Sequence, residues 1–296
     1  MPTSTTRRSR WGSRAGPGGG RVPGGDPQPA RLADAEPWRQ FGRPRLFFGV
    51  SPGNMDSMIN HYTANKKVRN DDAYSPGGRI GLRPDRATMP YCQRAREAFP
   101  GVPVIAGGVE ASLRRLAHYD YWSDTVKRSI LLDSKADLVV FGMGEQPIVE
   151  IARRLADGRS VRDLRDMRGV AYALGAKEGP PAGAIVLPSY EEIKADKHQF
   201  AKATRIIHQE TNPLNAKALV QYHDRQAVVA NPPSLPISQE DMDRVYGLSY
   251  TRRPHPMYKG EKIPAFETVK DSVTIMRGCF GGCTFCSITA HQGRII

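Results

Sequence analysis

The stretch VPVIAGGVEASLRRL, residues 102–116, decides the fold. It begins with a short apolar run, continues through two glycines, and then shows a helical pattern from Glu110 to Leu116. A short apolar run without alternation is typical of a strand that is buried on both faces of a sheet. The stretch therefore predicts a strand, a glycine turn and a helix, which together make one βα unit of an α/β protein.

The same pattern occurs on both sides of this stretch. Residues 46–50 (LFFGV) end in Ser-Pro-Gly before a helical pattern, and residues 138–141 (LVVF) end in Gly-Met-Gly-Glu before another. A further helix is predicted from Pro84 to Phe99. Repeated βα units predict a partial Rossmann-like domain with a parallel sheet over residues 46–158. The glycine turns then lie at the carboxyl ends of the strands, where open α/β sheets bind ligands.

The segments around this domain differ from it in composition. Residues 1–45 hold eight Gly, seven Pro and nine Arg, and we expect this Arg/Gly/Pro-rich leader to be disordered because it lacks an apolar period. Residues 159–270 contain isolated candidates, namely strands at Val170–Leu174 and Ala184–Leu187 and a helix at Lys197–Glu210. Since this pattern defines no core, we interpret these residues as a connecting region.

Charge and hydropathy restrict the function classes. The net charge is +13, but residues 1–45 contribute nine Arg against three acids, so the rest of the chain is only modestly basic. Such an excess suits a solvated surface, and nucleic acid is not an expected partner. The pair Arg114-Arg115 is likewise interpreted as a solvated helix face, with contact to a phosphate as the alternative. Because no apolar run is long enough for a membrane helix or a secretory signal, we expect a cytoplasmic protein without a membrane anchor.

The chemistry is concentrated in residues 271–296, DSVTIMRGCFGGCTFCSITAHQGRII. Residues 273–276 are rich in β-branched side chains and predict a strand, and a loop with three cysteines follows. Three residues separate Cys279 from Cys283 and two separate Cys283 from Cys286, and the glycines among them let the thiols converge. Crowded cysteines in a chain without a secretory signal indicate a metal ion or cluster.

The number of cysteines in the loop distinguishes a cluster from a zinc site. A four-iron cluster takes one thiolate per iron, so three cysteines leave one iron open for a substrate or cofactor. A structural zinc site needs four ligands, and His291 is the candidate fourth ligand in that alternative. The remaining Cys92 lies in the predicted helix 84–99 and is interpreted as a small buried residue. We favour the cluster and keep a non-catalytic zinc- or RNA-binding protein as the alternative function.

The cysteine spacing, with the aromatic Phe285 directly before the last cysteine, resembles the signature of the radical S-adenosylmethionine (SAM) superfamily. The resemblance implies that Cys279, Cys283 and Cys286 ligate a [4Fe-4S] cluster and that Phe285 lies near the adenine of SAM. It also implies that the reduced cluster cleaves SAM to methionine and a 5′-deoxyadenosyl radical, which abstracts hydrogen from a substrate. The implied partners are a reductant such as flavodoxin or ferredoxin and a substrate that is unknown.

Further blocks of sequence resemble the YgiQ-type radical SAM proteins over residues 46–296. These blocks are GNMDSMIN (53–60), GGVEASLRR (107–115), HYDYWSD (118–124) and MRGCFGGC (276–283). This resemblance implies an N-terminal domain followed by a radical SAM (βα) barrel, with residues 271–296 as the first strand and cluster loop. The strand–turn patterns also resemble cobalamin-binding-like Rossmann domains, but the Asp-x-His-x-x-Gly element that would ligate cobalt is missing.

Both ends of the chain depart from the family pattern. Residues 1–45 do not resemble it, and the later βα units of the barrel do not follow residue 296. We therefore expect a truncated radical SAM core in an incomplete, inactive fragment, which has the cluster ligands but lacks most of the cofactor cradle.

Overall fold

The apolar runs that end in glycine form the parallel half of one sheet. The computed structural model describes residues 34–53, 55–283 and 285–296. Three strands lie side by side in the order β1 (Phe48–Val50), β2 (Val104–Ala106) and β5 (Leu138–Val140), and both pairings are parallel. The helices between these strands supply the crossovers that parallel pairing needs. The three strands predicted from the apolar runs are confirmed.

The sheet continues with strands of mixed direction. β6 (Val170–Ala173) is antiparallel to β5, and β9 (Gln226–Ala230), β8 (Leu219–His223) and β7 (Ile185–Val186) follow in that order. A short turn with Asp224 at φ 57° joins β8 to β9, and so short a connection enforces antiparallel pairing. The seven strands of this sheet, all within the described ranges, confirm an α/β protein. The predicted parallel arrangement holds for only part of the sheet.

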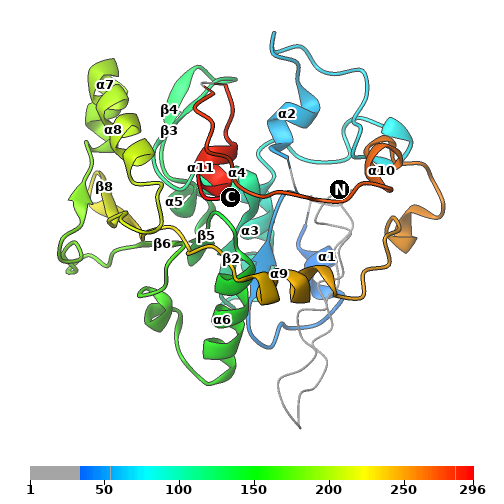
Figure 1. Cartoon of the computed structure of the whole chain (residues 1–296), viewed down its shortest axis with the longest axis horizontal. Coiled ribbons are helices and arrows are strands. Elements are labelled where there is room, and N and C mark those ends of the chain that lie inside the picture. Colours follow the sequence, from blue (N-terminus) through cyan, green and yellow to red (C-terminus); the bar gives the residue numbers. More distant parts are fainter. Residues whose placement is uncertain (1–33, 54, 284) are drawn as a thin grey trace.

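Helices cover both faces of the sheet (Figure 1). α3 (Thr88–Ala98), α5 (Ile130–Ser134) and α8 (Lys197–Gln209) pack on one face, and α6 (Glu145–Ala156) packs on the other. The side chains of β2 alternate between the two cores, with Ile105 on the α6 side. This alternation produces three layers, with a helix layer on each side of the sheet.

Shorter elements surround these layers. They are α1 (Glu36–Arg39), α2 (Ser57–His61), α4 (Gly108–Leu113), α7 (Tyr190–Ala195), α9 (Gln239–Tyr246), α10 (Pro264–Val269), α11 (Ile288–Gln292), the hairpin strands β3 (His118–Asp120) and β4 (Thr125–Lys127), and the 3-10 turns η2 (Pro76–Gly78), η3 (Val161–Leu164) and η4 (Pro256–Tyr258). Within the described part of the chain, no helix is both long and apolar enough to cross a membrane.

The helix predicted from Pro84 begins later, at Thr88. Arg86 has a φ of 50°, and this left-handed conformation cannot be part of a right-handed helix. Cys92 is fully buried in the helix, as predicted, and burial raises the pKa of its thiol to about 12. Cys92 therefore stays a neutral packing residue at neutral pH.

Regular structure begins earlier than the sequence pattern predicted. The pattern placed the first element at Leu46. Residues 1–33 of the predicted disordered leader lie outside the described residues, but residues 34–45 include α1. Trp38 of α1 is buried, and its ring centroid lies 6.1 Å from that of Tyr91 on α3. Burial of this large ring offsets the entropy of ordering the segment. The predicted disordered leader, residues 1–45, therefore extends too far toward its carboxyl end.

The strand predicted at residues 273–276 is not formed. The segment is irregular, and Val273 and Ile275 are 78% and 95% exposed. Strand propensity becomes stable structure only when neighbouring strands supply hydrogen bonds and packing, and none of the described strands pairs with this segment.

Candidate metal centre

The segment after the cysteine loop lies at the carboxyl ends of the parallel strands. α11 contacts α4, the helix that follows β2, and Figure 1 shows the two helices beside each other. At the end of β5, the backbone oxygen of His291 is 3.3 Å from the position that a Cβ atom on Gly142 would take. This is the edge at which open α/β sheets bind ligands.

Polar contacts attach the start of the loop to the rest of the molecule. The guanidinium of Arg277 pairs with the carboxylate of Glu145, the first residue of α6, at 2.6 Å. The backbone N–H of Cys279 donates to the backbone oxygen of Gly293, just after α11, at 3.1 Å. The loop is therefore fixed at its first cysteine by α6 and by the chain that follows the third cysteine.

Gly278, directly before the first cysteine, occupies a position that only glycine fits. Its φ is 77°, and a Cβ atom there would lie 2.2 Å from the backbone oxygen of Ile295. Its N–H donates to the Gln292 side-chain oxygen at 3.0 Å. A side chain at this position would separate the loop from α11 or strain the backbone.

Two of the three thiols approach the same glycine. A Cβ atom on Gly281 would lie 3.2 Å from Cys279 Sγ and 4.0 Å from Cys283 Sγ, so the absence of a side chain lets both sulfurs close in. The Gly281 N–H donates to Cys279 Sγ at 3.4 Å. Cys283 is exposed, while Cys279 and Cys286 are partly buried.

The donor chemistry of the loop fits an iron–sulfur cluster. Three thiols are available, an N–H already donates to one sulfur, and a Cβ atom on Gly282 would meet no described atom within 4 Å apart from its chain neighbours. Among the described residues, however, no three Cys, His, Asp or Glu side chains form a group that could hold a metal ion. The structure thus brings Cys279 and Cys283 together around Gly281 without assembling a full ligand set.

His291 and Phe285 take very different positions. Burial lowers the pKa of His291 to about 4, and its Nδ1 has no hydrogen-bond partner among the described residues. In the described part of the chain, neither the three cysteines alone nor the cysteines with His291 form an assembled metal-binding group. Phe285 is 90% exposed and is open to contact with another molecule.

A buried polar network around Glu110 holds the helices around the parallel strands. The Glu110 carboxylate on α4 is completely buried and accepts hydrogen bonds from the Ser57 N–H (3.1 Å), the Ser57 hydroxyl (2.6 Å) and the Thr88 N–H (2.9 Å). One turn later on α4, Arg114 pairs with Asp56, the N-cap of α2. The sequence signal for this network is the position of Glu110 just after a strand and its glycine turn, which suits a cap of helix N-termini.

These features define an α/β protein with a candidate iron–sulfur loop at the edge of its sheet. Comparison with known families agrees, because the model of the family described as Radical SAM N-terminal matches residues 25–272. The chain belongs to this family and is a YgiQ-type radical SAM protein.

Relatives with about half of their aligned residues identical support this assignment. The chain is 54% identical over 270 residues to UPF0313 protein GSU2873 of Geobacter sulfurreducens, covering 91% of this chain and 44% of that protein. It is 53% identical over 281 residues to UPF0313 protein RPA0679 of Rhodopseudomonas palustris (88% and 42%) and 47% identical over 313 residues to UPF0313 protein YgiQ of Escherichia coli (87% and 42%). The chain thus spans less than half the length of these curated relatives. No solved structure matches it.

Proposed function

We propose that this chain supplies the N-terminal domain and the cluster-binding loop of a radical SAM enzyme. Cys279, Cys283 and Cys286 would hold a [4Fe-4S] cluster, and Phe285 would contact the adenine of SAM. When bound, the cluster supplies the electron that cleaves SAM reductively. The observation that carries the proposal is the three-cysteine glycine loop in a chain of the Radical SAM N-terminal family.

The residues around the cysteines have positioning roles in this proposal. The Arg277–Glu145 pair and the tight turn at Gly278 fix where the first thiol enters the site. The Gly281 N–H stabilises the thiolate of Cys279 by donating a hydrogen bond to its sulfur. These contacts hold one side of the ligand set before any iron binds.

The exposure of the loop supports access by other molecules. Phe285 is 90% exposed and Cys283 is exposed, so both SAM and an electron donor can approach this face. We propose a small redox protein such as flavodoxin or ferredoxin as the reductant. The substrate of the hydrogen abstraction would meet the same face, since the reaction occurs where SAM is bound.

The finer description of the fold belongs to the same proposal. The three parallel strands with helical crossovers support a partial Rossmann-like, cobalamin-binding-like domain over residues 46–158, and residues 271–296 would begin the radical SAM barrel. Residues 159–270 would connect the two. The strands of this region also extend the sheet, because β6 pairs directly with β5.

Metal analysis of the reconstituted chain tests the proposal. The purified chain is incubated with iron and sulfide without oxygen, and we expect about four iron and four sulfide per chain and the electron paramagnetic resonance signal of a reduced cubane. Cys283→Ala removes one ligand and should reduce the iron content at least several-fold. The matched control is Cys92→Ala, which removes a buried thiol of α3 that is not part of the loop and should leave the iron content unchanged. Stoichiometric zinc without iron, or full iron content in the Cys283 variant, would refute the assignment.

A further inference from the structure

A pocket beside the cysteine loop contains a buried cation without an acidic partner. Arg115, which follows α4, is only 8% exposed and lines this pocket. No described carboxylate forms an ion pair with it, in contrast to its neighbour Arg114, which pairs with Asp56. Burial without a counter-charge lowers the pKa of Arg115 to about 10, so the guanidinium remains protonated at neutral pH.

One edge of this guanidinium contains a nitrogen without a hydrogen-bond partner among the described residues. Nη1 donates to the backbone oxygen of Ser112 at 2.6 Å, and the guanidinium carbon lies 4.4 Å from the centroid of the Phe141 ring. Nε is buried and has no hydrogen-bond partner among the described residues. The Nε–Nη2 edge of an arginine matches two oxygens of a carboxylate or phosphate, and a buried donor left unpaired is destabilising. The ring and the Ser112 contact hold this edge in place.

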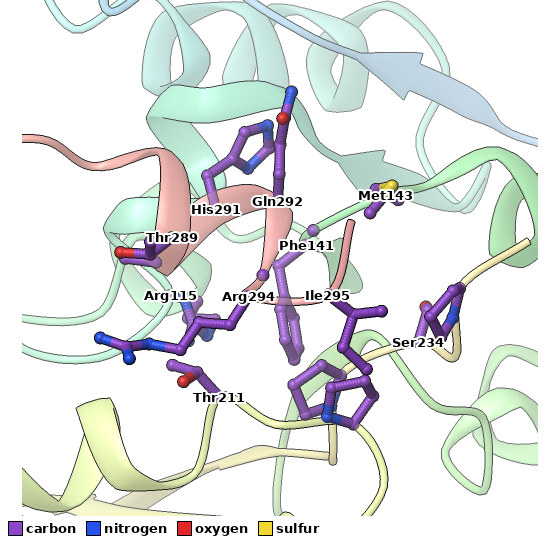
Figure 2. Close-up of a pocket in the computed structure, with 16 residues that line it drawn as sticks. Arg115, Phe141, Met143, Thr211, Ser234, Thr289, His291, Gln292, Arg294 and Ile295 are labelled. Carbon is purple, nitrogen blue, oxygen red and sulfur yellow. The ribbon is translucent and has the colours of Figure 1, made fainter. Parts of the chain in front are cut away.

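A second guanidinium reaches the same pocket from the segment after the cysteine loop. Arg294 lines the pocket, its Nε is also buried without a partner, and its Nη2 contacts His208 Nε2 at 2.7 Å. Figure 2 shows Arg294 and Arg115 on the same side of Phe141, with Thr211 beneath them. The two side chains give the pocket lining a positive charge that an anionic ligand would offset.

The rest of the pocket lining adds no negative charge. It consists of backbone, aromatic, aliphatic, thioether, proline, hydroxyl, amide and imidazole groups, and none of the described lining residues is Asp or Glu. The hydroxyl of Ser234, also in the lining, is packed against Gly169 and lies across Phe141 from the two arginines (Figure 2). An unpaired buried arginine and a second arginine, with no carboxylate in the described lining, together favour an oxyanion over a cation or an apolar ligand.

We propose that this pocket binds the carboxylate or phosphate group of a small anionic ligand, with Arg115 as the main anchor and Arg294 as the second. The ligand would connect α4 of the N-terminal domain to the segment eight residues after Cys286. Its binding would therefore stabilise the position of the chain on the carboxyl side of the cysteine loop. This inference does not depend on a cluster, because every residue in it belongs to the chain alone.

Thermal unfolding with inorganic phosphate and with acetate tests the site. Chloride is replaced stepwise by either anion at constant ionic strength, so that general screening by salt stays the same. A ligand that binds only the native state raises the unfolding temperature as its concentration exceeds the dissociation constant. We expect such a rise at about 1–10 mM for at least one of the two anions, which corresponds to a weak, group-sized interaction. A preference for one anion identifies a phosphate or a carboxylate as the recognised group.

Variants separate this pocket from binding elsewhere. Arg115→Gln should weaken the response at least tenfold, and Arg294→Gln, at a less buried position, should weaken it several-fold and can be used if the first variant does not fold. Arg153→Gln is the matched control, because its side chain is 68% exposed on α6 and pairs with Glu150. An unchanged anion response in Arg294→Gln, an equal loss in Arg153→Gln, or no response of the wild-type chain to either anion would overturn the proposal.

Discussion

Replacement of Glu110 by Gln tests whether the buried carboxylate on α4 holds the parallel half of the fold. The two carboxylate oxygens of Glu110 accept three hydrogen bonds from Ser57 and Thr88, the first residues of α2 and α3. A glutamine keeps the shape of the side chain but offers only one oxygen. If that oxygen keeps the two bonds to Ser57, the Thr88 N–H faces an amide NH₂ and loses its acceptor.

The expected loss of stability follows from these contacts. A buried backbone N–H left without an acceptor costs about 1–3 kcal/mol. The negative charge of Glu110 lies at the N-termini of both helices, and losing its interaction with each helix dipole removes about 0.3–1 kcal/mol per helix. The free energy of unfolding should therefore fall by about 2–4 kcal/mol, which is a large part of the ~5–15 kcal/mol typical of a folded protein.

Urea unfolding, followed by circular dichroism, measures this effect. With an m value of about 3 kcal/mol/M, the midpoint of Glu110→Gln should lie roughly 1 M below that of the wild-type chain. The matched control is Glu97→Gln on α3, because Glu97 is exposed and pairs with Arg94 one turn away, an interaction of about 0.2–0.5 kcal/mol. A midpoint for Glu110→Gln within the range of the control would refute the account of the network.

Two further predictions concern a buried imidazole and the turn before the first cysteine. His223 is 1% exposed, and burial lowers its pKa from 6.5 to about 4. Because the unfolded chain takes up the proton at a higher pH than the folded chain does, the free energy of unfolding falls as the pH drops from about 6.5 to about 4. The decline in urea midpoint from pH 7 to pH 5 should be smaller in His223→Phe than in the wild-type chain. The matched control is His198→Phe, because the side chain of His198 is 98% exposed, and this variant should show the same decline as the wild-type chain. Gly278→Ala should increase the rate of tryptic cleavage after Arg277 by about tenfold, since strain of ~1–2 kcal/mol and a backbone clash release the loop. Gly282→Ala adds a methyl group in open space, and an equal increase there would contradict this reasoning.

The sequence predicted the parts of the fold that short-range patterns determine. The runs around Val104 and Val139 are apolar at every position, and each is buried on both faces of the sheet as expected. The β8–β9 hairpin was missed because its inward positions include Gln221 and His223, which hide the apolar pattern. Gln221 is nevertheless fully buried, since it accepts from the Ala117 N–H at 2.7 Å and donates to the Pro188 oxygen at 3.0 Å. These partners are distant in sequence, so no local pattern reveals them.

The same limit applies to the candidate site. The ligand role of Cys279, Cys283 and Cys286 is a prediction from residue types and spacing, which are local properties. The burial of Arg115 could not be predicted in this way, because its interpretation as a solvated residue followed from its charge, whereas the structure buries it against Phe141. Burial of a cation depends on which segments fold over it, and one of those segments begins 174 residues later, at Thr289.

The placement of the cysteine loop therefore depends on a few polar contacts and not on strand pairing. No described strand pairs with residues 273–276, so the loop is held by the Arg277–Glu145 pair and by the chain after α11. That chain carries Arg294 to the pocket that contains Arg115. Both side chains are positively charged, and an anion held by both would add an attractive link between the end of α4 and this segment. Occupation of the pocket should consequently change how firmly the cysteine loop is held, which makes the proposed anion site a means of preparing the thiols for their ligand.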